Sequence, residues 1–374
     1  MFKKAMVVIL AALTMFALAA GPVCAASEEE GSEENAAAAT GKVSNTLAED
    51  EEALISTYTG QFEELAYEDK ESGLSITYNL FLPEGYEESA LYPMVVFIAD
   101  SSCAGKEAAA SLTQGLGALV WASEEWQETY PAIVAVPTYP ETILDDHSGY
   151  TTTEYVELTK RFIDYMSTEY AVDTDRIYGT GQSMGCMTTL ILASEYPDLY
   201  AACMFVDGQW DISTLSGLED QTFVYFAAED DTSAWNGAQE VMAMFDEDDV
   251  EYAYAQWDGN WSAEELSAAA QDLFTGEMEK YFISWKTGTI EAGSGNGEAG
   301  GFGNGEKVGS GSPDGNGFGK NGDAETEGPD GAGRGTMKGN GGPGGIGGAS
   351  VHMASFDYAY NCIAVMEWLF GQTK

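Results

Sequence analysis

The feature that most constrains this fold is a serine between two glycines, in the segment 181–185 (GQSMG). The stretch 176–180 before it is a candidate short strand, and residues 184–195 after it have the apolar spacing of a helix that ends before Pro197. Glycines two positions either side of the serine permit a tight turn that larger side chains would crowd. The pattern therefore predicts a strand, a sharp turn and a helix in direct succession.

This turn makes Ser183 a candidate nucleophile. It lifts the hydroxyl above the sheet edge at a helix N-terminus, where the Met184 N–H can face a developing oxyanion. A serine hydroxyl reacts poorly until a positioned base, usually histidine, takes its proton. The chain has two histidines, and His352 alone follows the serine, as the base does in folds with this turn. We expect His147 to lie near the mouth of the site or on the surface. The competing interpretation is a glycine-rich turn with an unreactive serine.

The acid that would orient the histidine is expected after a later strand. The apolar run 223–226 leads into Glu229, Asp230 and Asp231. A carboxylate at that strand end could hold the imidazole tautomer and stabilise the imidazolium. Asp231 and Asp230 both qualify by position and Glu229 is conceivable, whereas the remaining acids would be solvated loop carboxylates.

Three further positions complete the predicted site. A second oxyanion donor is expected in the turn after the apolar strand 94–98, from the N–H of Ser101 or of Ser102. Gln182 and Trp210 are candidates for substrate binding. For Trp210 the alternative, a core tryptophan at a strand end, is equally open. We predict no metal and no cofactor, since the Gly/Asp pattern at 314–317 sustains no calcium-binding repeat.

Continuous apolar runs alternate with helical patterns along the chain, which indicates an α/β fold with a mostly parallel sheet flanked by helices. The expected strands are 74–82, 94–98, 133–136, 176–180, 202–206 and 222–227, and the expected helices are 153–170, 184–195 and 358–370.

The N-terminus is typical of an exported protein. A basic start (MFKK) precedes the apolar run 5–20, and small residues follow, so residues 1–26 are predicted to be a signal peptide. A membrane anchor is the alternative, but the run is short for a span. Lipid anchoring through Cys24 is disfavoured by Val23. We expect a secreted protein with no stable membrane insertion after cleavage.

One low-complexity segment precedes the predicted domain, which spans 61–374, and a second lies within it. Residues 27–60 are rich in Glu, Ala, Ser and Asn and are interpreted as an acidic linker. Residues 291–350 are dominated by glycine, and they cannot bury enough apolar surface to offset the entropy of ordering. We expect them to form a long flexible insert just before His352.

The net charge limits the kinds of partner that the chain can bind, and the cysteines bear on whether it contains disulfides. With 15 basic and 62 acidic residues the net charge is −47, which excludes nucleic acid and anionic membranes as partners. Signal cleavage would leave Cys103, Cys186, Cys203 and Cys362, which we interpret as buried free thiols rather than disulfides. The sequence makes no prediction of oligomeric state.

Several short motifs resemble those of bacterial α/β-hydrolases of the prolyl-oligopeptidase-like and esterase branch, which includes secreted peptidases, feruloyl esterases and polyhydroxybutyrate-depolymerase-like proteins. The segments are 114–118 (QGLGA), 121–123 (WAS), 176–185, 196–199 (YPDL) and 208–211 (GQWD).

The resemblance covers about residues 65–290 and 350–372 and implies the α/β-hydrolase fold with Ser183, Asp231 and His352 as its catalytic triad. In that family the histidine loop is shorter, and a glycine usually stands where this chain has Cys186.

These observations predict a secreted serine hydrolase that cleaves a small-molecule carboxylic ester, or a peptide bond, through an acyl-enzyme. The ester is favoured because its leaving group demands less of the general acid. The alternatives are a catalytically weak or inactive surface or binding protein on a hydrolase fold, and a transferase that uses the same acyl-enzyme.

Overall fold

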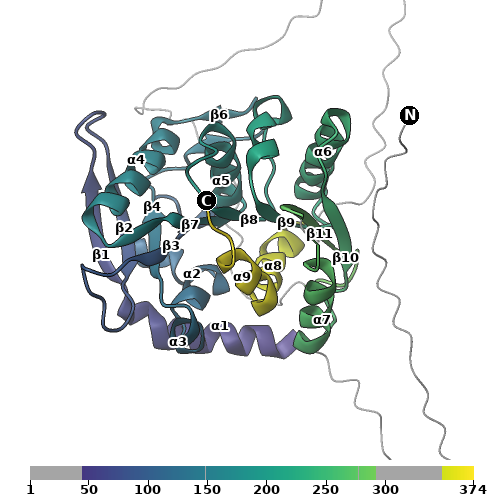
Figure 1. Cartoon of the computed structure of the whole chain (residues 1–374), viewed down its shortest axis with the longest axis horizontal. Coiled ribbons are helices and arrows are strands. Elements are labelled where there is room, and N and C mark those ends of the chain that lie inside the picture. Colours follow the sequence, from purple (N-terminus) through teal and green to yellow (C-terminus); the bar gives the residue numbers. More distant parts are fainter. Residues whose placement is uncertain (1–43, 148, 277, 292–347) are drawn as a thin grey trace, which may run out of the picture. The chain divides into compact units, whose positions relative to one another are not determined.

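The computed structural model describes residues 44–147, 149–276, 278–291 and 348–374 (Figure 1). The predicted signal peptide, the first part of the linker and residues 292–347 of the predicted insert lie outside the described residues. All described residues belong to one compact unit.

A nine-stranded sheet forms the centre of this unit, with the strand order β1-β2-β4-β3-β7-β8-β9-β11-β10. The pairs β1–β2 and β2–β4 are antiparallel and the other neighbouring pairs are parallel, which confirms the predicted mostly parallel α/β sheet. The strands are β1 Glu63–Glu68, β2 Ser75–Phe81, β3 Tyr92–Ile98, β4 Ile133–Thr138, β7 Val172–Gln182, β8 Ala202–Val206, β9 Phe223–Ala228, β10 Ala253–Trp257 and β11 Lys280–Trp285. A separate hairpin pairs β5 Leu144–Asp145 with β6 Thr151–Thr152.

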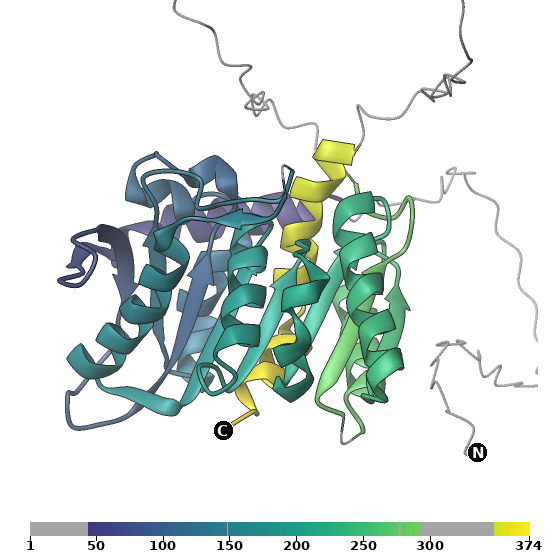
Figure 2. The ribbon, with the colours of Figure 1, turned by 90° about the horizontal axis from the view of Figure 1, so that it is seen from above.

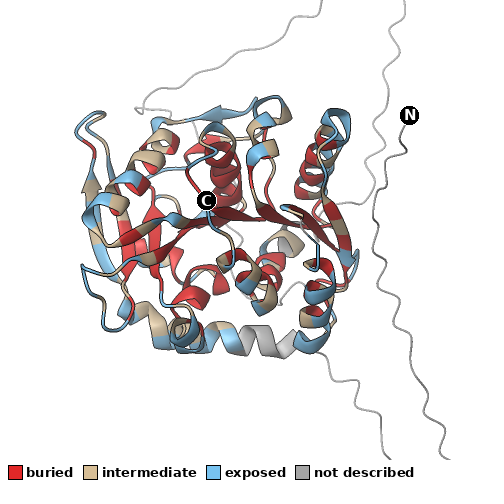
Figure 3. Ribbon diagram, viewed as in Figure 1, coloured by how far each residue is buried: buried red, intermediate tan, exposed pale blue. Residues whose placement is uncertain are grey.

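The central strands are mostly apolar because both faces of the sheet are covered (Figure 3). Every residue of β4, β8, β9 and β11 is buried. The strands expected from the sequence all fall on strands of this sheet. The apolar runs therefore predicted the middle of the sheet correctly.

Helices cover the two faces (Figures 1 and 2). One hydrophobic cluster joins the sheet to α4, α5 and α6, and a second joins it to α2, α7, α8 and α9. The helices are α1 Ser44–Tyr58, α2 Leu116–Leu119, α3 Glu124–Thr129, α4 Glu154–Glu169, α5 Met184–Glu195, α6 Thr232–Asp248, α7 Ala263–Leu273, α8 Gly348–Tyr360 and α9 Ile363–Phe370. Short 3-10 turns lie at Thr59–Gln61, Ser101–Cys103, Ala108–Ser111, Val120–Ala122, Ile212–Thr214 and Ser216–Asp220.

The linker prediction is wrong over residues 44–58, which form α1. Leu54, Ile55 and Tyr58 pack against the core, and the Tyr58 hydroxyl accepts a 2.9 Å hydrogen bond from the Glu124 N–H. A segment of this composition gains its helical stability from such tertiary packing rather than from its own residues. The average composition of residues 27–60 is polar and acidic, so it did not reveal that three apolar side chains near the end of the segment pack against the core.

The C-terminal segment also differs from the prediction. The single helix expected over 358–370 is two helices, because α8 ends at Tyr360 and α9 begins after Cys362. Helix α8 begins at Gly348, so the end of the predicted flexible insert is helical and His352 lies in a helix rather than a loop.

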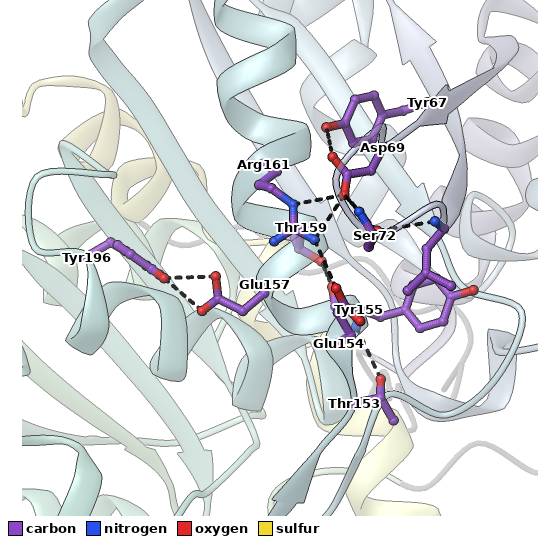
Figure 4. A network of polar contacts seen from close by, with 11 residues as sticks. Tyr67, Asp69, Ser72, Thr153, Glu154, Tyr155, Glu157, Thr159, Arg161 and Tyr196 are labelled. Carbon is purple, nitrogen blue, oxygen red and sulfur yellow. Dashed lines mark hydrogen bonds and ion pairs between the residues drawn. The ribbon is translucent and has the colours of Figure 1, made fainter.

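One polar network ties the antiparallel edge of the sheet to α4 (Figure 4). The Arg161 guanidinium lies 3.1 Å from Asp69 Oδ2, and the same oxygen accepts hydrogen bonds from the N–H and hydroxyl of Ser72. One turn earlier in α4, Glu157 accepts a hydrogen bond from the hydroxyl of Tyr196. These contacts join β1, α4 and the chain beyond α5.

The four cysteines in the described part of the chain are buried free thiols, as expected. In the same residues, none of the helices combines the length and hydropathy that a bilayer span requires.

Candidate active site

The turn at Ser183 has the predicted geometry. Ser183 stands between β7 and α5 with φ 52° and ψ −115°, a region that a non-glycine residue occupies only under constraint. A Cβ on Gly185 would lie 1.9 Å from the Ile98 carbonyl oxygen, and one on Gly181 would lie 2.5 Å from the Gly185 carbonyl carbon. Both glycines are therefore needed for the backbone to close around the serine.

His352 contacts Ser183 on one side and Asp231 on the other. Its Nε2 lies 2.9 Å from the Ser183 Oγ, and its Nδ1 is hydrogen-bonded to the Asp231 Oδ2. With the Nδ1 proton held by a carboxylate, Nε2 is the nitrogen that can accept a proton from the serine. The three side chains thus form a continuous chain of hydrogen bonds.

Asp231 is held in place by the helix that it begins. It follows β9 and caps α6, and its Oδ1 accepts the N–H groups of Ser233 at 3.2 Å and Ala234 at 3.3 Å. These contacts leave Oδ2 for His352.

The other two candidate acids point elsewhere. Asp230 accepts the Gly288 N–H at 2.6 Å, and Glu229 accepts the N–H of Thr287 at 3.0 Å and the hydroxyl of Ser284. Both carboxylates therefore hold the chain that follows β11. Of the three acids, Asp231 is the one in contact with His352.

The electrostatics of the site favour a proton on the imidazole. Burial lowers the pKa of His352, but the acidic groups around it, first of all the hydrogen bond and charge of Asp231, outweigh burial and raise the pKa above its usual value. An imidazolium formed during a reaction would be stabilised by the same groups. The Phe356 ring packs edge-on against the imidazole at 4.9 Å.

The sequence predicts two backbone N–H groups, those of Met184 and Ser101, as oxyanion donors. Met184 is the first residue of α5, where N–H groups have no carbonyl partner within the helix. The Ser102 N–H already donates to the Asp100 carboxylate at 2.6 Å. Ser101, whose N–H makes no hydrogen bond to another described residue, is thus the more available donor in this turn.

The two predicted substrate-binding residues are buried. Gln182 is 1% exposed and donates to the Gln114 side chain at 2.8 Å. Gln114 also accepts the Asp100 N–H and donates to the Ser102 hydroxyl, so the pair ties the serine turn to the predicted oxyanion turn. This structural link was not predicted.

Trp210 is 5% exposed and belongs to the hydrophobic core, as the alternative interpretation expects. Its ring meets that of Tyr150 edge-on at 5.3 Å. The His147 side chain is 73% exposed and 3.4 Å from Asp146, which places this histidine on the surface.

One residue of the site was missed by sequence reasoning. Asp207 follows β8, is fully buried, and contacts Ser355 one helical turn after His352. Ser183, Asp207 and Asp231 follow the neighbouring strands β7, β8 and β9, at the sheet edge where functional groups of parallel sheets gather. An acid directly after a buried strand was the available signal.

Comparisons with known proteins identify the family of this chain. The family described as "Putative esterase" matches residues 70–273, more than half of the chain. Acetylxylan esterase A of Emericella nidulans is 28% identical over 143 residues, which cover 32% of this chain and 47% of that protein.

The solved structure of a thermostable esterase is similar with a TM-score of 0.56 and 20% identity, over 84% of this chain and 64% of that one. The chain therefore spans about half the length of the acetylxylan esterase and somewhat more of the second protein. At this identity the structural likeness supports the α/β-hydrolase fold. Together, the matched family and the nine-stranded sheet show that the chain belongs to the esterase family of the α/β-hydrolase fold.

Proposed function

We propose that this chain is a serine esterase in which Ser183, His352 and Asp231 form the catalytic triad. The observation that carries the proposal is the unbroken contact from Asp231 through His352 to the Ser183 hydroxyl, on a turn that presents the serine at a helix N-terminus. The same constellation activates serine on several unrelated folds.

In the first half of the reaction the Ser183 Oγ attacks the ester carbonyl carbon as its proton moves to the His352 Nε2. The oxyanion that forms accepts hydrogen bonds from the N–H groups of Met184 and Ser101. The imidazolium, stabilised by Asp231, then donates its proton to the departing alcohol oxygen. The product is a Ser183 acyl-enzyme and a free alcohol.

In the second half, water gives a proton to His352 and attacks the acyl carbonyl. Collapse of the second tetrahedral intermediate returns that proton to the Ser183 oxygen and releases a carboxylic acid. Each group works in both halves, so one triad is sufficient for the complete cycle.

The substrate class that we propose is a small carboxylic ester, acted on outside the cell after removal of residues 1–26. The matched family and the acetylxylan esterase support an ester in preference to a peptide. An alcohol is also an easier leaving group than an amine, which must be protonated before it departs.

The test combines a fluorophosphonate probe with hydrolysis of p-nitrophenyl acetate. We expect the probe to modify Ser183 and both signals to disappear in Ser183→Ala. His352→Ala should remove them as well, whereas His147→Ala is the matched control because it removes the exposed histidine instead. A folded wild-type protein with neither labelling nor hydrolysis would instead support a binding protein on a hydrolase fold. Acyl transfer to an added alcohol that outcompetes water would indicate a transferase.

A further inference from the structure

Asp207 is a buried carboxyl that the proposed triad does not use. It follows β8 with φ 43°, a left-handed conformation that aspartate tolerates better than most residues, and is 0% exposed. Its Oδ1 accepts the Ala228 N–H at the end of β9, at 2.7 Å. This bond anchors the carboxyl to the strand that leads to Asp231.

The other oxygen of Asp207 contacts the hydroxyl of Ser355, which lies within hydrogen-bond distance of two acceptors but has one proton to donate. Asp207 Oδ2 is in hydrogen-bond contact with the Ser355 Oγ, which lies 2.8 Å from the His352 carbonyl oxygen. A serine hydroxyl carries one proton. If Asp207 were ionised, its carboxylate and the carbonyl would compete for that proton, and the Ser355 hydroxyl could donate to one of them alone.

A proton on Asp207 removes this conflict. Asp207 Oδ2–H then donates to Ser355, and the Ser355 hydroxyl donates to the His352 carbonyl, so that every polar atom in the chain has a partner. A fully satisfied buried network is much more favourable than one with a missing partner.

The surroundings of Asp207 favour the same protonation state. Burial, followed by the negative charge of Asp231, raises the pKa of Asp207 to about 7. The other titratable groups that face it are His352 on α8, Cys186 on α5 and Tyr225 on β9. Burial raises the pKa of both Cys186 and Tyr225 well above their ordinary values, so neither compensates a charge on Asp207.

We propose that Asp207 is a positioning residue that carries a proton, donates it to Ser355 and thereby fixes the backbone of His352. The role in catalysis rests on the proposed serine esterase function, whereas the proton itself does not depend on it. His352 lies in the first half of α8, immediately after residues 292–347, and Ser355 is one helical turn further on. The hydrogen bonds from Asp207 through Ser355 therefore hold the base of the triad near the start of α8.

If Asp207 is neutral, Asp231 is the charged carboxylate that pairs with His352. Both carboxyls lie near His352, and an ionised Asp207 would add a second negative charge beside the imidazole. Two neighbouring carboxyl groups share charge unequally because ionising both is costly. The geometry assigns the charge to Asp231, which has two N–H donors and the imidazole, and the proton to Asp207, whose remaining partner is a hydroxyl.

The proton can be observed directly by infrared spectroscopy of the full-length protein at pH 6. We expect a protonated carboxyl signal that is lost in Asp207→Asn. Asp357 is the assignment control, because burial also raises the pKa of its carboxyl to about 7, and Asp357→Asn should remove a different signal. An ionised Asp207 at pH 6 would overturn the proposal whether or not the protein hydrolyses esters.

The positioning role is tested by two substitutions of Asp207 and one of Ser355. Asp207→Ala and Ser355→Ala should each lower kcat by about tenfold or more, with little change in KM, because a misplaced base costs rate rather than binding. Asp207→Asn should restore most of the loss, since its amide donates to Ser355 as the protonated carboxyl does. The kcat of Asp207→Asn relative to that of the wild type should also rise as the pH increases through 7, because Asp207 of the wild type then loses its proton.

If Asp207→Asn is instead as inactive as Asp231→Asn, Asp207 acts as a charged acid and the proposal is wrong. Should Asp207→Ala fail to fold, Asp207→Asn and Ser355→Ala decide the question. The two histidines also make imidazole NMR simple to assign. An His352 resonance unchanged by Ser355→Ala would contradict the positioning role, even in a protein without measurable turnover.

Discussion

The hydroxyl of Tyr360 lies 2.9 Å from the hydroxyl of Thr180, which joins the end of the histidine helix to the strand that carries Ser183. Thr180 also donates to the Met204 carbonyl at 2.8 Å, so Tyr360 is the donor in this pair. A second contact comes from Asp357, which accepts the Leu116 N–H at 2.7 Å. Helix α8 is therefore fixed at its far end, and this helps to explain how His352 meets a serine 169 positions earlier.

Removing the Tyr360 hydroxyl should loosen this attachment. We expect Tyr360→Phe to lower the free energy of unfolding by about 1 kcal/mol, and by more if Thr180 finds no other donor. Because the bond aligns α8 with β7, kcat should also fall. Tyr254→Phe is the matched control, since it removes a 2.9 Å contact with Ser284 that involves neither α8 nor a triad residue, and it should lower Tm without lowering kcat. Equal kcat values in the two variants would contradict the alignment role.

A methyl group at Gly185 should destroy the serine turn. Its Cβ would meet the Ile98 carbonyl oxygen at 1.9 Å, and backbone atoms cannot move aside as a flexible side chain can. We expect Gly185→Ala to destabilise the protein by more than about 4 kcal/mol, at the extreme end for a single substitution, or to prevent folding. Gly60→Ala, which meets nothing within 4 Å, should leave Tm and fluorophosphonate labelling unchanged. Normal labelling of Gly185→Ala would show that the turn can relax.

The pH dependence of ester hydrolysis should follow His352. A protonated imidazole cannot accept the serine proton, so kcat/KM should fall as the pH drops through the His352 pKa. Burial lowers this pKa, but the acidic groups led by Asp231 outweigh burial and raise it, so the acid limb should lie above the ordinary histidine value of about 6.5.

Asp231→Asn should move the acid limb to lower pH and reduce kcat by about 10⁴-fold, because the imidazole loses the partner that sets its tautomer. Asp230→Asn is the control, since this carboxylate holds the Gly288 N–H instead of the imidazole. If Asp230→Asn is the more damaging of the two, the acid has been assigned to the wrong residue.

The network of Figure 4 should contribute stability that depends on pH. Hydrogen bonds from Ser72, opposed by burial and assisted by Tyr67 and Arg161, lower the pKa of Asp69 to about 2. Because the folded-state pKa is depressed, this contribution is complete above the unfolded value of about 4 and is lost as the pH falls towards 2.

Asp69→Asn should accordingly lower Tm at pH 6, and its difference from the wild type should shrink between pH 4 and pH 2. Asp164→Asn removes an exposed ion pair with Lys160 and should change Tm little at any pH. A pH-independent deficit in Asp69→Asn would indicate that packing, not ionisation, is lost.

The sequence was most informative where the constraint is local. Gly181 and Gly185 predicted the turn, and the apolar runs predicted β3, β4, β8 and β9, because backbone sterics and two-sided burial act on neighbouring residues. The order of Ser183 and His352 along the chain was enough to select the candidate base. The sequence alone could not choose between Asp230 and Asp231, since both are adjacent and both are acids.

Tertiary structure decided what depends on partners distant in the chain. The direction of each carboxylate after β9 assigned Asp231 to His352 and Asp230 to Gly288. Packing against the core made α1 a helix within a segment whose composition predicts a linker. Asp207 acquired its role only because β8, β9 and α8 converge on it.

The sequence by itself thus determined the turn, the strands and the candidate nucleophile and base, because these follow from periodicity and residue type. The pairing of buried polar groups was decided by the fold, because it depends on which elements meet.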